Sequence, residues 1–188
     1  MTKEEVHIIR DSDPALSYKG ACLYYDETPF SGIVKGTFAY QEFETGLPHN
    51  RHIRLHPNGE VALLARYFTG KPTMHYEFSA TGELNPATYI AYNTFPDYSL
   101  HNVKNAQHPG FFQGELGRLE YEKEVFTGVK VGNYAYWEYS VGLLDELHVE
   151  FHQNGELAKV GKYDMAEKQW EVNFYDNGEL VNTGKTKA

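Results

Sequence analysis

The sequence predicts an all-β fold, an antiparallel meander of β-hairpins that is repeated as two duplicated halves. The turn Asn-Gly-Glu occurs three times, at residues 58–60, 154–156 and 177–179. Asn-Gly is the strongest short-range hairpin signal, because a type I′ turn needs positive φ at both central residues. Aromatic residues make up 15% of the chain, and such residues favour strands. The third observation is an internal repeat with a spacing of 96 residues.

The repeat is seen in the turn glycines and in the residues around them. Aligning residues 23–84 with 119–180 without a gap gives identical residues at about one third of the positions. Four glycines of the first half lie 96 residues before four of the second, namely Gly32, Gly46, Gly59 and Gly82 before Gly128, Gly142, Gly155 and Gly178. Such spacing indicates a repeat architecture, in which each unit is one supersecondary element.

Within each half, turns recur every 11–13 residues and leave arms of strand length. Alternation supports the strands, since Ile53 and Leu55 share one face while His52 and His56 share the other. We expect five or six strands in each half, at about 21–26, 33–43, 50–56, 61–67 and 73–78 and 96 residues later. Residues 1–20 are predicted to pair as an extra strand or to cap one end.

The two halves are predicted to form one β-repeat domain over residues 1–188. Their limits are 21–84 and 117–180, and a connector at 85–116 breaks the repeat between them. A connector of this length is either functional or packed as an ordered loop.

Composition limits the class of partner and the compartment. The net charge of −9 argues against direct binding of nucleic acid, because the chain would repel phosphates. Cys22 is the only cysteine, which suits a reducing compartment. No apolar run has the length of a signal-peptide core or a membrane helix. We therefore expect a cytoplasmic protein that does not bind membranes.

The repeat unit resembles the MORN-variant repeat of bacterial proteins that are often described as antitoxin components. The resemblance covers about two-thirds of the chain. It is carried by residues 55–61, 67, 70–71, 76–78 and 82–84, and by 151–157, 163, 170 and 174–180. The family's second glycine and following tryptophan are missing after Gly70-Lys71, and Ala166 replaces a glycine in the second half. The resemblance implies an elongated, curved sheet of hairpins and a role similar to that of antitoxins and immunity proteins.

The sequence contains little that indicates a catalytic site or a metal site. His52 and His56 recur as His148 and His152, but residues i and i+4 of a strand lie about 13 Å apart, too far to share one zinc ion. We interpret these histidines as a polar, solvent-facing stripe that was kept by the duplication. No Gly-x-Ser-x-Gly or phosphate-loop motif is present. We expect no enzyme activity, no cofactor and no metal.

An aromatic and acidic cluster in the second half is the candidate partner-binding site. Residues 134–139 would place aromatic side chains on both faces of a strand, and acids follow on the next strand. Exposed Tyr and Trp among carboxylates are typical of a hot spot for a basic partner. The alternative is that the connector covers the second face. The candidate residues are Tyr134, Tyr136, Trp137, Glu138, Tyr139, Asp145, Glu146 and Glu150.

The predicted function is that of an immunity protein or antitoxin. It would bind and neutralise a cognate bacterial toxin, such as a basic nuclease, by occluding the active site of the toxin. The alternative is a non-enzymatic scaffolding module that binds another protein or the cell envelope. A third class, a carbohydrate-binding or hydrolytic β protein, would need two carboxylates 5–10 Å apart in an aromatic groove.

Overall fold

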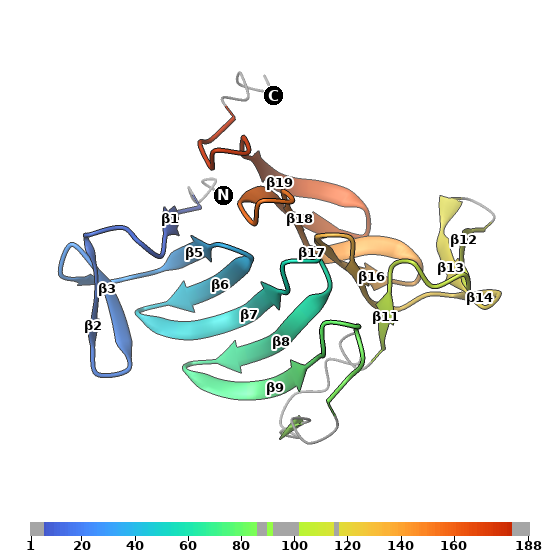
Figure 1. Cartoon of the computed structure of the whole chain (residues 1–188), viewed down its shortest axis with the longest axis horizontal. Helices are drawn as coiled ribbons and strands as arrows, with labels where there is room; N and C mark the ends of the chain where they lie inside the picture. The colour runs from blue at the N-terminus through green and yellow to red at the C-terminus, as the bar shows by residue number, and fades with distance from the viewer. Residues whose placement is uncertain (1–5, 86–89, 92–101, 115–116, 182–188) are drawn as a thin grey trace. The chain divides into compact units, whose positions relative to one another are not determined.

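The computed structural model describes residues 6–85, 90–91, 102–114 and 117–181, and these residues form strands and turns without an α-helix (Figure 1). The strands of the first half are β1 (Ile8–Arg10), β2 (Leu16–Lys19), β3 (Cys22–Tyr25), β4 (Thr28–Pro29), β5 (Gly32–Gly36), β6 (Ala39–Glu44), β7 (Leu47–Leu55), β8 (Val61–Phe68), β9 (Lys71–Glu77) and β10 (Ile90–Ala91). Those of the second half are β11 (Val103–Asn105), β12 (Phe111–Gln113), β13 (Leu119–Tyr121), β14 (Glu124–Val125), β15 (Gly128–Gly132), β16 (Ala135–Ser140), β17 (Leu143–Phe151), β18 (Leu157–Asp164) and β19 (Glu167–Asn173).

Each half contains one large sheet and one small three-stranded sheet. The large sheets have the strand orders β1-β5-β6-β7-β8-β9-β10 and β11-β15-β16-β17-β18-β19. The small sheets are β2-β3-β4 and β12-β13-β14. Consecutive strands of the meanders pair antiparallel, and only β1 with β5 and β11 with β15 pair parallel within the described residues. The all-β class, the hairpin meander and the two similar halves are thus confirmed.

Two local expectations change in the structure. The range 33–43 forms two strands, because a tight turn after Gly36 places Phe38 at a φ of 55° and returns the chain at Ala39. The range 85–116 holds strands β11 and β12, which correspond to β1 and β2 of the first half. These strands begin 95 residues after their counterparts rather than 96. The ungapped alignment therefore did not reveal them.

The chain divides into two compact units by its internal contacts. The first contains Met1–His56 and Val61–Phe95, and the second contains Pro57–Glu60 and Pro96–Ala188. In the part of the chain that the structure describes, no helix is long and apolar enough to cross a membrane.

One face of each large sheet forms its core. In the first, Tyr40, Ile53, Leu64 and Tyr76 are buried and lie opposite one another across β6, β7, β8 and β9. Residues that lie directly opposite in neighbouring strands share a face, so their side chains pack as one continuous line. Burying each such side chain contributes about 1.5–3 kcal/mol. Because side chains alternate along a strand, this buried line determines which residues lie on the opposite face of the sheet.

A second cluster joins the small sheet to the large one in the first half. Leu23, Phe30 and Phe43 form its buried centre. Four half-buried apolar residues pack against them, namely Ile9, Leu16, Tyr25 and Val34. The parallel strand β1 and the β2–β3 hairpin are thus held to the sheet by apolar contacts.

Gly46 packs tightly against the backbone of this cluster, which allows the packing to be tested by substitution. Its N–H donates to the Phe30 carbonyl and its own carbonyl accepts from the Leu23 N–H, both at 2.7 Å. Its φ is 81°, and an added Cβ would collide with Cys22 Sγ and lie 2.7 Å from the Leu23 carbonyl oxygen.

We predict that Gly46→Ala lowers the free energy of unfolding by about 3 kcal/mol, because it combines an unfavourable positive φ with a backbone collision. Urea denaturation measures the change. The control is Gly20→Ala, where φ is 65° but no atom lies within 4 Å of the added Cβ, so the loss should be roughly 1–2 kcal/mol. Equal losses for the two variants would show that the collision is unimportant.

Candidate functional site

A line of side chains crosses the second large sheet on the face opposite its Tyr136–Val149–Val160 core. Its members are register partners across β15 to β19, namely Lys130, Trp137, His148, Gly161 and Glu171. We call this line the Trp137 row. The equivalent line of the first sheet, the Gln41 row, consists of Val34, Gln41, His52, Ala65 and His75.

The two rows differ at every position except the central histidine. The core lines on the opposite faces keep their character, since Tyr40 and Tyr136 are both almost fully buried at equivalent positions. The other positions of the core lines change between apolar residues, such as Ile53 and Val149, whereas the rows also change charge, as from Val34 to Lys130. These changes in charge and polarity make this face the candidate site.

His148 lies at the centre of the Trp137 row between two aromatic rings. Its ring centroid is 5.7 Å from that of Trp137 and 6.1 Å from that of Tyr163. Gly161 leaves room for this arrangement, because an added Cβ would lie 3.0 Å from Tyr163 Cε2. The Tyr163 hydroxyl donates a hydrogen bond of 2.7 Å to Glu171 Oε2. Burial, followed by this carboxylate, raises the pKa of Tyr163 to about 12.

The side chain of His148 is 8% exposed and contacts a carboxylate. His148 Nε2 lies 2.7 Å from Glu150 Oε1, and Lys159 Nζ lies 3.6 Å from the same oxygen. The His148 contact is the largest influence on Glu150, and it holds the pKa of that carboxyl below its ordinary value. Neither buried ring nitrogen of His148 makes a hydrogen bond of regular geometry, so the short contact with Glu150 is a close polar contact.

The histidine stripe is therefore not solvent-facing as the sequence suggested. His148 is buried, and His52 of the Gln41 row packs against Tyr67 with ring centroids 6.3 Å apart. Half of the residues on a strand point to the face opposite the core, and here aromatic side chains cover that face. Alternation alone does not distinguish such a face from solvent.

Two of the predicted partner-binding residues belong to the core instead. Tyr136 and Glu138 are 1% and 2% exposed, and the Tyr136 hydroxyl donates a hydrogen bond of 2.6 Å to Glu138 Oε1. A buried carboxyl is tolerated when it is hydrogen-bonded. These two side chains therefore do not belong to an exposed partner surface. Tyr139 is half-buried and packs edge-on against Phe126, and Tyr134 occupies the β15–β16 turn with a φ of 63°.

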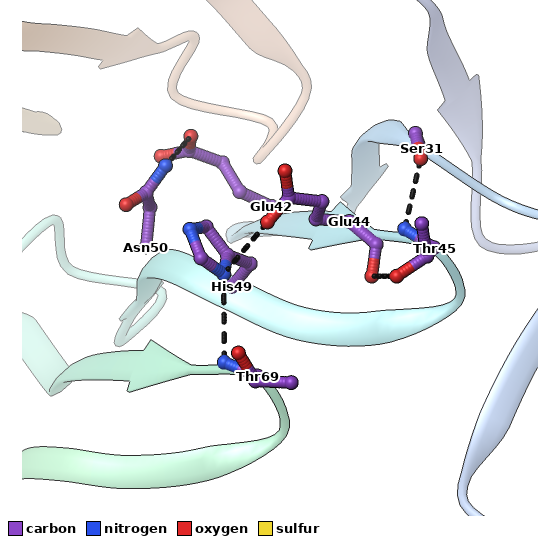
Figure 2. A network of polar contacts seen from close by, with 7 residues as sticks. All are labelled: Ser31, Glu42, Glu44, Thr45, His49, Asn50 and Thr69. Atoms are coloured by element: carbon purple, nitrogen blue, oxygen red, sulfur yellow. Dashed lines mark hydrogen bonds and ion pairs between the residues drawn. The ribbon is translucent and has the colours of Figure 1, made fainter.

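The predicted acids have local partners. Asp145 Oδ1 accepts a hydrogen bond of 3.0 Å from the Met165 N–H. The equivalent His49 accepts from the Thr69 N–H at 3.4 Å in the polar network of Figure 2, so this position fastens the next hairpin turn in both halves. Glu146 Oε2 lies 3.6 Å from Lys162 Nζ, with both side chains more than half exposed.

Of the eight predicted residues, the structure places Trp137 in the row and Glu150 beside it. It adds Lys130, His148, Tyr163 and Glu171, which sequence reasoning missed. Differences between equivalent positions of the two halves could have found Lys130 and Glu171, which replace Val34 and His75. They could not have found His148 and Tyr163, because the first half has the same residue types at these positions. The sequence-based search instead used local richness in aromatic residues and acids.

The arrangement suits recognition by packing. Among the described residues, no group of three His, Cys, Asp or Glu side chains could hold a metal ion. The row and its neighbours combine half-exposed aromatic surface with carboxylates that are already paired, as in Glu150 with Lys159 and Glu171 with Lys168 at 3.3 Å. Surfaces of this composition are typical of protein interfaces.

Comparisons with known proteins do not assign the chain. No family model, no curated protein and no solved structure matches it.

His52 provides a prediction for pH dependence. Burial, then the charge of Arg54 and the proximity of His75, lower the pKa of His52 from 6.5 to about 4. A histidine whose pKa falls on folding contributes stability above pH 6.5, and this contribution is lost as the pH drops toward 4. Between pH 6.5 and 4, we expect the free energy of unfolding to fall less in the His52→Asn variant than in the wild type.

The measurement is the free energy of unfolding by urea at pH values from 7 to 4, together with an NMR titration of the imidazole. An imidazole that titrates near 6.5 in the folded protein would contradict the prediction.

Proposed function

We propose that this protein binds another protein through the Trp137 row, and that the partner is a cognate bacterial toxin whose active site it occludes. The class of partner comes from the resemblance to MORN-variant antitoxin and immunity proteins. The location comes from one observation, which is that Trp137 occupies the position of Gln41 on the face where the two halves diverge.

Trp137 has the properties of an interface anchor. It is half-buried and its ring packs at a tilt against His148, so the ring is held in place before a partner binds. A large aromatic side chain that is already ordered loses little conformational entropy on binding. Tryptophan is also among the residues that most often dominate binding energy.

The charges around Trp137 favour specificity over simple attraction. Lys159 and Lys168 lie beside Glu150 and Glu171, so these acids do not form an uncompensated negative patch. A partner must therefore match an alternating set of charges. Such a match sets register and excludes wrong partners more than it adds affinity.

We predict that Trp137→Ala weakens binding of the toxin at least tenfold, because it removes the ordered aromatic surface at the centre of the row. The measurement is co-purification with the product of the adjacent gene, followed by titration calorimetry and a growth assay of cells that express the toxin. Protection of those cells should fall in parallel with affinity.

The matched control is Gln41→Ala at the equivalent position of the first sheet, which should leave affinity and protection unchanged. The midpoint of urea denaturation of each variant separates a lost contact from lost folding. A wild-type chain that binds no toxin and gives no protection would refute the proposal. Equal effects of the two substitutions would move the binding surface away from the row.

A further inference from the structure

Two lysines lie side by side at the first end of the Trp137 row. Lys104 of β11 and Lys130 of β15 are direct register partners in a parallel pair, so both side chains share one face of the sheet. Neighbouring strands are about 4.8 Å apart, which brings the two side chains close together. Like charges directly opposite each other are destabilising in a sheet.

Both ammonium groups lie over aromatic rings of the β12–β13 hairpin. Lys104 Nζ is 4.9 Å from the ring centroid of Tyr121, and Lys130 Nζ is 5.1 Å from that of Phe111. These two rings pack edge-on with centroids 5.0 Å apart. Lys130 Nζ is also 5.4 Å from the ring centroid of Trp137. The lysine pair is therefore continuous with the proposed binding surface.

The first half has no lysines at this place. The positions of Lys104 and Lys130 correspond to Ile9 and Val34, which pack against the apolar cluster around Phe30. The second half keeps Tyr121 at the place of Tyr25, but it has Phe111 at the place of Leu16 and replaces both aliphatic residues with cations. Folding alone does not require this change, since the apolar pair stabilises the same junction in the first half.

The lysine pair is not neutralised within the described residues. No carboxylate there lies within ion-pair distance of either ammonium, although the chain carries 26 acidic residues. Burial lowers the pKa of Lys130, and no nearby acid offsets this effect. Cation–π contacts recover part of the lost hydration of an ammonium, but they supply no counter-charge.

We propose that Lys104 and Lys130 form an anion-binding subsite that receives a carboxylate, the Asp or Glu side chain of the protein partner. This inference rests on the proposed function, which supplies a partner at the same surface. A carboxylate between the two ammonium groups would relieve their mutual repulsion. The same partner would also reach Trp137, whose ring centroid is 5.4 Å from Lys130 Nζ.

A carboxylate fits this place better than a phosphate-rich ligand. The chain carries a net charge of −9, so a polyanion such as nucleic acid is repelled by the rest of the molecule. A single carboxylate on a partner surface adds only one negative charge. The contact also reverses the simplest electrostatic expectation, because an acidic group of the partner would meet an acidic protein.

The test is an NMR titration of the full chain labelled with ¹³C-lysine, which requires no protein partner. Glutarate is the carboxylate probe, and sodium chloride and pyrophosphate are compared with it at equal ionic strength. We expect the Cε signals of Lys104 and Lys130 to move saturably with glutarate in the millimolar range. The matched control is Lys162, an exposed lysine paired with Glu146, whose signal should move no more than with chloride.

The substitutions Lys104→Ile and Lys130→Val introduce the residues of the first half, which suit the same junction. Each should reduce the glutarate-induced shift of the remaining lysine at least threefold. Equal, unsaturated shifts of all lysines would overturn the proposal. Saturation with pyrophosphate and not with glutarate would overturn the carboxylate assignment in favour of a phosphoryl ligand.

Failure of this subsite is distinguishable from failure of the proposed function. If the protein binds a toxin through Trp137 but shows no glutarate response, the proposed function is supported and the anion-binding subsite is refuted. A saturable glutarate response without any toxin binding would support the anion-binding subsite. It would refute the proposed function, so the source of the carboxylate would then not be a toxin.

Discussion

The register between neighbouring strands is the constraint on which the rest of the structure depends. Side chains alternate along a strand, so a slip of one residue would exchange the two faces of a sheet. In the second half, Tyr136 lies opposite Val149, and Val149 lies opposite Val160, all of them buried. Once this core line is in place, the residues between its members must point to the other face. The Trp137 row is the necessary complement of that core.

The same register explains how two sheets with one core pattern present different surfaces. At the centre of the core line the two halves keep apolar residues of similar volume, such as Ile53 in one half and Val149 in the other. The opposite face is under a weaker constraint, because its side chains need only cover the sheet. A glutamine can therefore become a tryptophan, and an alanine a glycine, without disturbing the strands.

Sequence reasoning predicted the strand-rich fold and its duplication because both depend on local signals. Turn glycines and alternation are visible in a single chain. The reasoning failed for Glu138, since a polar residue type does not reveal that a tyrosine hydroxyl satisfies it inside the core. It also missed Lys130, whose environment is formed by Phe111 and Trp137 from other strands. Such environments depend on pairing across the sheet, which composition along one strand does not report.

The tandem arrangement has a consequence for symmetry. A homodimer of one half would carry identical surfaces on both subunits, so each new charge or ring would appear twice. In a single chain the copies can diverge. One junction between the large and small sheets remains apolar around Phe30, while the other holds Lys104 and Lys130 beside Phe111. Covalent linkage of the copies thus permits the two halves to differ, with an apolar junction in one and a cationic junction in the other.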